Sequence, residues 1–203
     1  MNPSNRRWLA ARATLALALA WAASAPAEER RALATPHPGT HAARPGLAST
    51  AVLKLPLRIE GESLVGSALP SAGPVSAQDM SQFGSDWSSG AHLFWQPPDP
   101  VDTPIRNWPH LTFSIDVAVD GTYALAILHT RAPDYGDVRV FVRGQPVADL
   151  SGYAASVQAA RVEAGQVKLK AGKNQVVLTV FRRPAGSKAS YVGLDALELA
   201  RQP

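Results

Sequence analysis

The chain contains no cysteine among its 203 residues. Thiolate nucleophiles, thiol redox chemistry and cysteine-ligated zinc are therefore excluded, and no disulfide can cross-link the fold. A chain of this length buries a hydrophobic core without such cross-links. Its stability then has to come from apolar packing, to which a bound metal ion can add.

Long hydrophobic runs are also missing. The apolar stretch Ala13–Ala23 is shorter than the roughly 20 residues that span a bilayer. Three arginines precede it and the small residues Ser24-Ala25-Pro26-Ala27 follow it, which is typical of a secretory signal peptide. A buried helix or membrane anchor is the alternative. We expect residues 1–27 to be removed and the protein to be exported to the periplasm or the extracellular space. The Arg6-Arg7 pair leaves the general and the twin-arginine export routes both open.

Excess positive charge is absent from most of the chain. The net charge is +4, but residues 1–27 hold three arginines and no acid, and residues 28–52 hold three arginines and two glutamates. Residues 53–203 are therefore formally neutral. A neutral domain lacks the basic surface that binds nucleic acid or an anionic membrane. We expect neither nucleic acid nor, after signal cleavage, a membrane as a partner.

Residues 28–52 have no apolar periodicity. Their breaker clusters, such as Thr35-Pro36-His37-Pro38-Gly39, predict a disordered linker rich in proline and alanine. His37 and His41 have the spacing of a helical metal pair, but the neighbouring prolines oppose a helix.

From residue 53 to residue 203, apolar side chains recur with a period of two. The clearest alternating runs are Leu111–Val119, Tyr123–Leu128, Val138–Val142 and Val176–Phe181. Turn dipeptides separate them: Asp120-Gly121, Arg143-Gly144 and Ala171-Gly172. This pattern predicts an all-β domain, an antiparallel β-sandwich or jelly roll, preceded by the signal peptide helix and the linker. Only the alanine-rich residues 154–164 suggest a short helical turn.

Three stretches resemble a known family. They are Ile59-Glu60-Gly61-Glu62-Ser63-Leu64, the region from Trp87 through Trp95 to Thr130-Arg131-Ala132-Pro133-Asp134-Tyr135-Gly136-Asp137-Val138, and Tyr191–Leu199. Residues 58–199 resemble a carbohydrate-binding-module-like β-sandwich. This is a galactose-binding-domain-like jelly roll, near carbohydrate-binding families six and thirty-five, of the type appended to exported bacterial glycoside hydrolases. The resemblance implies a polysaccharide or glycan as partner.

Glu60 and Glu62 have the spacing that places two side chains on one side of a strand. Carboxylates so placed repel each other and need cations or hydrogen-bond donors. The resemblance implies a structural Ca²⁺ held by Glu60, Glu62 and Asp195. Alternatively, the acids are solvated or pair with arginines such as Arg58 or Arg182.

Aromatic residues make up only 7% of the chain, yet several lie in or beside expected loops. Aromatic rings bind sugars because the apolar C–H face of a pyranose packs on a π surface while polar groups read the hydroxyls. The candidate ligand-binding residues are Trp87, Trp108 and Tyr135, with Asp134 and His92 as polar neighbours. Trp95 is expected in the core. The alternative places these aromatics in the core and makes Asp134-Tyr135-Gly136 a structural turn.

Signatures of catalysis are scarce. The chain has no Gly-x-Ser-x-Gly motif, and His92, His110 and His129 lack close metal-ligand spacing. His129 with Asp134 or Asp137 is an acid–base pair to consider. The sequence thus favours an exported, non-catalytic carbohydrate-binding module that binds glycan through loop aromatics and carries a structural calcium. A structural or protein-interaction sandwich is the alternative, and a small glycan-active hydrolase or lyase is the third reading.

Overall fold

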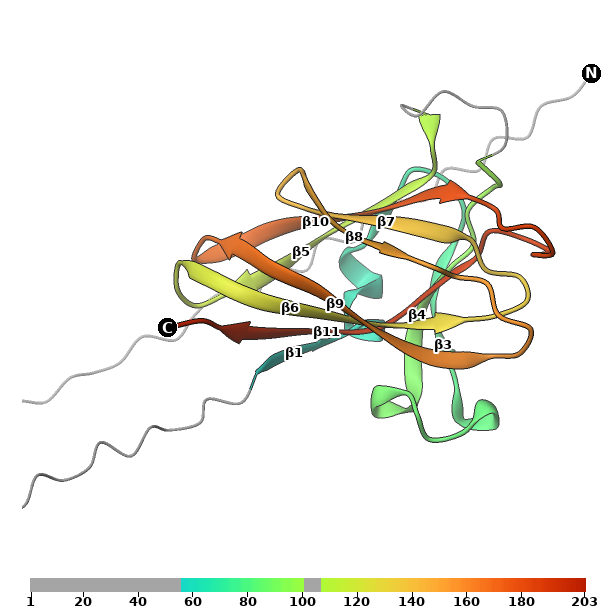
Figure 1. Ribbon diagram of the computed structural model, residues 1–203, viewed down its shortest axis with the longest axis horizontal. Helices are drawn as coiled ribbons and strands as arrows, with labels where there is room; N and C mark the ends of the chain where they lie inside the picture. The colour runs from blue at the N-terminus through green and yellow to red at the C-terminus, as the bar shows by residue number, and fades with distance from the viewer. Residues whose placement is uncertain (1–55, 101–106) are drawn as a thin grey trace, which may run out of the picture. The chain divides into compact units, whose positions relative to one another are not determined.

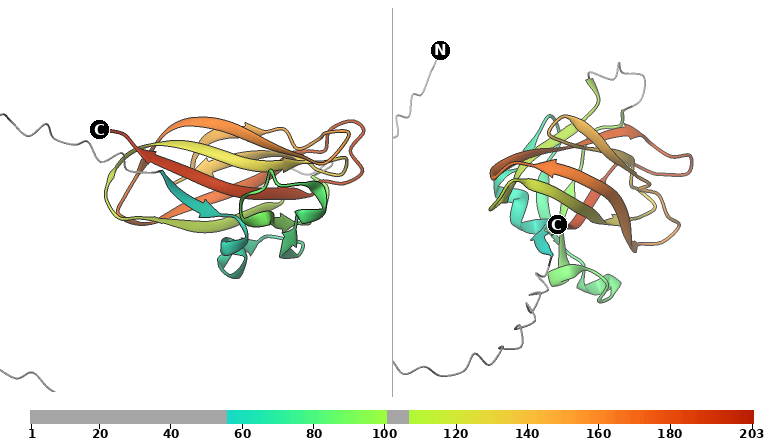
Figure 2. Two further views of the ribbon diagram at one scale, coloured as in Figure 1. Left: turned by 90° about the horizontal axis from the view of Figure 1, so that it is seen from below. Right: turned by 60° about the vertical axis from the view of Figure 1, so that its left-hand side comes forward.

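The computed structural model describes residues 56–100 and 107–203. The predicted signal peptide (residues 1–27), the predicted linker (28–52) and residues 53–55 of the predicted domain lie outside these ranges. His37 and His41 belong to that linker. Two antiparallel sheets pack face to face, as Figures 1 and 2 show. The predicted all-β sandwich is thereby confirmed. Within residues 56–100 and 107–203, no helix has the length and apolarity needed to cross a bilayer.

The first sheet has the strand order β3-β4-β11-β6-β9, with β1 added beside β11. β11 pairs with β4 at its start and with β1 further along, so the first and last strands of the domain lie side by side. The strands are β1 (Leu57–Glu60), β3 (Val75–Asp79), β4 (Ala91–Trp95), β6 (Gly121–Arg131), β9 (Gln158–Leu169) and β11 (Val192–Arg201).

The second sheet has the order β2-β5-β10-β7-β8. Its strands are β2 (Leu69–Pro70), β5 (His110–Val117), β7 (Asp137–Val142), β8 (Gln145–Leu150) and β10 (Gly172–Arg182). Three short 3-10 helices lie between the early strands: η1 (Glu62–Ser67), η2 (Ser81–Phe83) and η3 (Ser88–Gly90).

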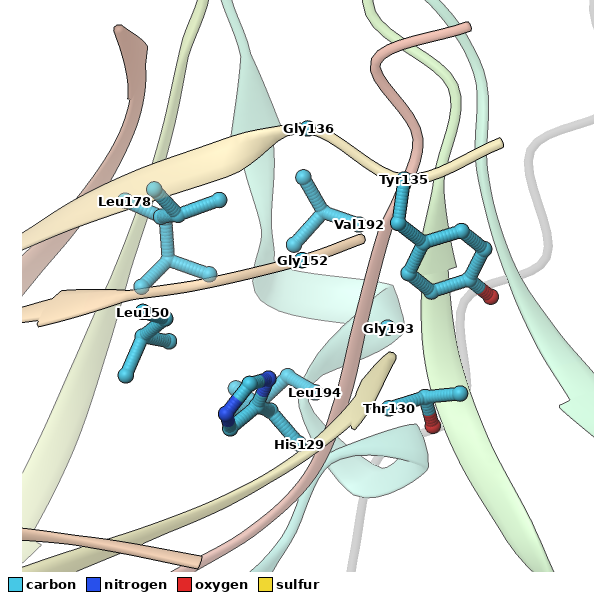
Figure 3. A pocket seen from close by; sticks show the side chains of 11 residues that line it. His129, Thr130, Tyr135, Gly136, Leu150, Gly152, Leu178, Val192, Gly193 and Leu194 are labelled. Atoms are coloured by element: carbon cyan, nitrogen blue, oxygen red, sulfur yellow. The ribbon is translucent and has the colours of Figure 1, made fainter. Parts of the chain in front are cut away.

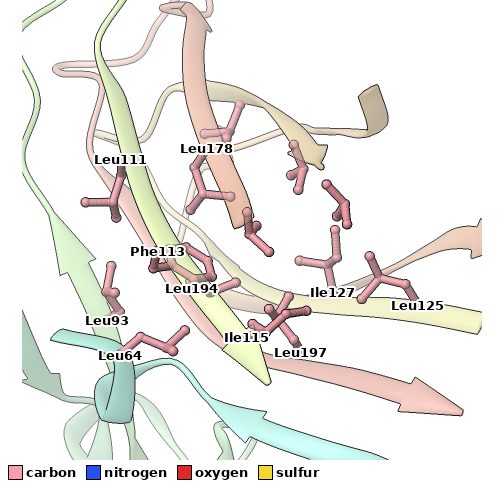
Figure 4. Packing of buried hydrophobic residues seen from close by; sticks show 14 of the residues in the cluster. Leu64, Leu93, Leu111, Phe113, Ile115, Leu125, Ile127, Leu178, Leu194 and Leu197 are labelled. Carbon is pink, nitrogen blue, oxygen red and sulfur yellow. The ribbon is translucent and has the colours of Figure 1, made fainter. Parts of the chain in front are cut away.

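The core lies between the two sheets and follows the alternation of the sequence (Figure 4). In β5, Leu111, Phe113 and Ile115 point inward, while the residues between them are exposed or half-buried. Trp95 is fully buried, as expected. Each large aliphatic side chain removed from water in this way contributes about 1.5–3 kcal/mol, so the period-two pattern is also the main source of stability.

The turns confirm one prediction and the strands correct two others. Arg143 and Gly144 both have positive φ (51° and 77°), as a two-residue turn between β7 and β8 requires. The expected helical turn within residues 154–164 is wrong, because β9 pairs with β6 along all of that strand and its ladder overrides alanine's helix propensity. Glu62 does not continue the first strand but begins η1.

The sandwich has two distinct ends (Figure 1). We call the terminal end the one that holds the start of β1, the turn between β5 and β6 and the last residues of β11. The loop end holds the connections after β6, β8 and β10, which isolated bridges tie together at Ala132–Tyr153 and Tyr135–Tyr191.

Candidate functional site

Three acidic residues gather where β1 meets β11. Glu60 ends β1, and Asp195 is the extra residue of a bulge in β11, since the pairing with β6 shifts between Leu194 and Ala196. A bulge of this kind turns a side chain out of its regular position. The backbone N–H of Gly61 donates a 2.7 Å hydrogen bond to the Asp195 carbonyl oxygen, which brings the Glu60–Glu62 segment against the bulge.

Gly61 is required for this close approach. A Cβ atom at this position would overlap the carbonyl oxygen of Leu194. The glycine of the Glu-Gly-Glu segment therefore has a steric cause: it lets the backbone between the two glutamates touch β11. This contact fixes the cluster that we call the carboxylate cluster, namely Glu60, Glu62 and Asp195.

Two serines at the start of η3 link the carboxylate cluster. The Ser88 N–H donates to Asp195 Oδ1 at 2.9 Å, and Ser88 Oγ lies 3.0 Å from the same oxygen while also contacting Glu60 Oε2. Ser89 Oγ donates to Glu62 Oε1. One hydroxyl has a single proton, so Ser88 Oγ cannot fully satisfy two carboxylates. The cluster is short of donors.

The charges in the cluster are only partly compensated. Arg58 Nε lies 3.0 Å from Glu60 Oε1, the arginine pairing that the sequence left open. Burial raises the pKa of Asp195 above its usual range, although hydrogen bonds from Ser88 act in the opposite direction. Glu62 has no ion-pair partner in the described ranges, and its Oε2 atom is buried without a hydrogen bond.

The donor set suits a hard cation. Ca²⁺ prefers carboxylate, carbonyl and hydroxyl oxygens, and an orphaned buried carboxylate oxygen is the kind of atom that it would satisfy. Among residues 56–100 and 107–203, no group of three or more His, Cys, Asp or Glu side chains already converges as a metal site. Glu60 and Asp195 both contact the Ser88 hydroxyl. Glu62 instead accepts a hydrogen bond from the hydroxyl of the next residue, Ser89.

A buried polar chain runs from Trp87 to Gln78 beneath the loop that carries η2 and η3. Trp87 Nε1 donates to Thr130 Oγ1 at 2.7 Å, Thr130 Oγ1 lies 2.7 Å from His92 Nδ1, and His92 Nε2 lies 2.9 Å from Gln78 Oε1. The three contacts are satisfied together when the Thr130 hydroxyl donates to Nδ1 and His92 carries its proton on Nε2. Burial lowers the pKa of His92 to about 4, which keeps the imidazole neutral.

This polar chain changes the roles expected for two candidate residues. Trp87 is only 5% exposed and His92 is fully buried, so neither offers a ring face to a ligand. Both instead attach the η2–η3 loop and β4 to the first sheet. For Trp87, the alternative that the sequence left open, a buried structural tryptophan, is the one that fits.

Aromatic rings cluster beside this chain on the outer face of the first sheet. Phe94 stacks on Tyr135 at a centroid distance of 6.2 Å and meets Tyr191 edge-on at 5.5 Å. It also stacks on His92 at 6.1 Å. Phe94 and Tyr191 are half-buried, whereas Tyr135 is 5% exposed. We call Phe94, Tyr135 and Tyr191 the aromatic cluster.

The Tyr135 hydroxyl is the polar group of the aromatic cluster. It makes no hydrogen bond to the residues that the structure describes, and it points away from the interior side chains Leu150 and Leu178 (Figure 3). Burial is the main cause that raises the pKa of Tyr135, so the phenol stays protonated and can donate.

The segment around Asp134 has a structural role. The Asp134 carbonyl oxygen accepts the Tyr191 N–H at 3.0 Å, and the Gly136 N–H donates to the Tyr191 carbonyl oxygen at 3.0 Å. Asp134-Tyr135-Gly136 thus ties the connection after β6 to the start of β11, as the turn alternative proposed. Asp134 places the aromatic cluster through its backbone.

Trp108 lies apart from the other candidates. Its half-buried ring is 6.4 Å from Phe181 on the second sheet, and Arg139 lies over the Phe181 ring. The structure therefore brings Trp87, His92, Asp134 and Tyr135 into one region and leaves Trp108 on another surface.

His129 faces the interior rather than solvent. It borders a small cavity of about 10 Å³ between the sheets (Figure 3), and burial lowers its pKa to about 4. Asp137, its proposed acid–base partner, accepts the Gly152 N–H at 3.0 Å and pairs with Arg182 at 2.5 Å. The acidic side chain is therefore already occupied.

Sequence reasoning missed Phe94, Tyr191, Thr130 and the two serines. The alternation of β4 could have placed Phe94 on the outer face. It lies between Leu93 and Trp95, which point into the core, and is two residues from His92. No sequence pattern indicated a role for Ser88 and Ser89, since that role depends on a contact between η3 and a bulge more than 100 residues later in the chain.

No family model and no curated protein matches this sequence. Solved structures do match. A domain of Paenibacillus xanthan lyase shares the fold, with a TM-score of 0.57, 15% identity and coverage of 75% of this chain but only 14% of the lyase.

Two solved carbohydrate-binding modules match over almost their whole length. A family 35 carbohydrate-binding module from Clostridium thermocellum is 16% identical, with a TM-score of 0.44 and coverage of 71% of this chain and 98% of the module. The CBM36-1 domain of a multidomain xylanase from the hindgut metagenome of Trinervitermes trinervoides is 11% identical, with a TM-score of 0.45 and coverage of 73% and 98%. These modules are similar to the chain in fold. The resemblance predicted from the sequence is confirmed at the level of the fold.

Proposed function

We propose that this domain is a non-catalytic glycan-binding module whose ligand packs on the aromatic cluster. The observation that carries the proposal is the pairing of half-buried rings with an unused donor. Phe94 and Tyr191 lie at the surface, and the Tyr135 hydroxyl beside them has no partner among the described residues. A sugar ring needs both an apolar surface to stack on and a hydroxyl partner.

The proposal assigns no catalytic role. His129, which the sequence offered as an acid–base group, is buried, and its pKa is lowered to about 4. Asp137 is held by Arg182 and Gly152. A general acid or base has to reach its substrate with a pKa near the working pH, and these groups meet neither condition.

Calcium belongs to the same proposal as a structural ion. Glu60, Glu62 and Asp195 would hold it, with the orphaned Glu62 Oε2 as one ligand atom. The ion would supply positive charge to a cluster that is short of donors and would join β1, β11 and η3. Export to the periplasm or the extracellular space is part of the proposal.

Affinity gel electrophoresis against soluble galactomannan, xylan, β-1,3-galactan and xanthan tests the proposal. We expect at least one polymer to retard the protein and Phe94→Ala to abolish the retardation. Phe141→Ala is the matched control, because Phe141 is also a half-buried aromatic but lies on the second sheet.

Tyr135→Phe separates binding from folding. Its hydroxyl makes no hydrogen bond to residues 56–100 or 107–203, so the free energy of unfolding should stay unchanged. Loss of one hydrogen bond to the glycan should weaken binding about fivefold. The proposal fails if no polymer retards the wild type, or if Phe94→Ala and Tyr135→Phe both bind like the wild type.

One observation favours the alternative, a protein-interaction sandwich. Phe141, Val177, Thr112 and Leu69 pair across neighbouring strands and form an apolar row on the outer face of the second sheet. Leu69 is 70% exposed. Exposed apolar rows of this kind mark protein contacts. Concentration-dependent sedimentation of the wild type that Leu69→Lys removes would support this alternative.

A further inference from the structure

A groove at the terminal end is independent of the aromatic cluster and the carboxylate cluster. It lies between the start of β1, the turn from β5 to β6 and the last residues of β11, which meet at this end in Figures 1 and 2. Its volume is about 590 Å³, within the range of small-molecule sites. The walls are mainly apolar and consist of Leu57, Val117, Val119, Tyr123 and Leu199.

The walls of the groove expose apolar surface. Leu57, at the start of β1, is 41% exposed. Val119 is 39% exposed, although the turn between β5 and β6 would ordinarily carry a polar residue there. The Tyr123 hydroxyl donates a 2.7 Å hydrogen bond to the Val119 carbonyl oxygen. This bond fixes the turn and leaves the Tyr123 ring as an apolar wall. The groove is therefore held in shape by the fold.

The charged residues at the rim differ in their engagement. Arg58 is occupied by Glu60 and Glu198 at 3.0 and 2.8 Å. Arg201 contacts the Asp120 carbonyl oxygen at 3.2 Å and forms no ion pair with the residues that the structure describes. A guanidinium without a carboxylate partner is a ready donor for one, in paired hydrogen bonds. Asp116, on the opposite rim, disfavours a second negative charge on the ligand.

We infer that this groove is a second ligand site, which binds a small amphipathic carboxylate. The aliphatic or aromatic body of the ligand lies against Leu57, Val119 and Tyr123, and its single carboxylate meets Arg201. Polysaccharide fits less well, because these walls offer few partners for sugar hydroxyls. The site stands or falls separately from the proposed function, since the two share no residue.

Titration of the full chain with octanoate, and in parallel with 1-octanol, tests the inference by calorimetry and by backbone amide shifts. We expect octanoate to bind more tightly than octanol, with shifts at residues 117–123 and 199–201. Arg201→Gln should weaken octanoate binding about tenfold, equivalent to about 1.4 kcal/mol, and leave octanol binding unchanged. Lys188→Gln removes an equal charge at the loop end and should change neither.

Val119→Glu places a carboxylate in the groove and should prevent octanoate binding. The residue is exposed, so the variant should fold. The inference is overturned if wild type binds neither probe, if octanoate and octanol bind equally, or if Arg201→Gln binds octanoate like the wild type.

Discussion

The indole N–H of Trp87 donates a 2.7 Å hydrogen bond to the Thr130 hydroxyl oxygen, and the two residues are 43 positions apart in the chain. This bond turns the tryptophan inward and makes it part of the scaffold. It also places the η2–η3 loop, which carries Ser88 and Ser89, against the carboxylate cluster. The positions of the loop and the cluster therefore depend on one buried threonine.

Thr130→Val tests this dependence. Valine has the same shape but leaves the Trp87 N–H without an acceptor and His92 Nδ1 without a donor. Each buried unsatisfied group costs about 1–3 kcal/mol, so we expect the free energy of unfolding to fall by about 2–4 kcal/mol in urea titrations. Thr112→Val, at a half-buried position on the outer face of β5, is the control and should change it by less than about 0.5 kcal/mol. Equal effects would contradict the scaffold role.

The buried histidines predict acid sensitivity. In the folded state the pKa of both His92 and His129 is lowered to about 4, whereas the unfolded value is 6.5. The unfolded chain therefore binds more protons between pH 6.5 and pH 4, and stability falls as the pH falls through this window. Each histidine should contribute about 1.4 kcal/mol per pH unit. Asp195, with its raised pKa, opposes part of this loss at the acidic end.

Urea titrations at several pH values measure the slope. His129→Leu should remove about half of the pH dependence between 6.5 and 4.5. A stability that is flat over this window in the wild type would show that the histidines are charged or solvated in the folded state.

Calcium should stabilise the domain through the carboxylate cluster. Addition of Ca²⁺ at one hundred times its Kd would raise the free energy of unfolding by about 2.7 kcal/mol, and chelator should reverse the gain. Glu62→Gln should abolish the response, because it neutralises the carboxylate with the orphaned oxygen. Asp195→Ala should abolish it as well. Glu163→Gln, which neutralises an exposed carboxylate paired with Arg161, should keep it. If the melting curves with and without chelator are identical, the proposal of a structural calcium is wrong.

Gly193→Ala should destabilise the polar chain by overpacking. A Cβ atom at Gly193 would lie 2.6 Å from His92 Cε1 and 3.0 Å from Thr130 Cβ. Overpacking of this kind costs about 1–3 kcal/mol, which should appear as a lower melting temperature. Gly66→Ala meets no atom within 4 Å and should leave the melting temperature close to that of the wild type. A tolerant Gly193→Ala variant would show that His92 can move.

The sequence by itself determined the sandwich, because an apolar residue at every second position can be buried only on one face of a strand. The resemblance implied that Glu60 and Asp195 lie close together, since it placed both around one ion. Both do lie at the junction of β1 and β11. Glu62 departs from it, because η1 begins where the strand was expected to continue.

Only the tertiary structure decided which aromatic rings face solvent. Trp87 and Tyr135 lie between strands, as expected, but a hydrogen bond to Thr130 holds the first in a buried position and stacking on Phe94 covers most of the second. The bulge at Asp195 and the contact of Ser88 with it could not be predicted from the sequence either. Local patterns report the period of a strand, whereas a side chain's partner across the sheet depends on register, and register is set by the packing of the whole domain.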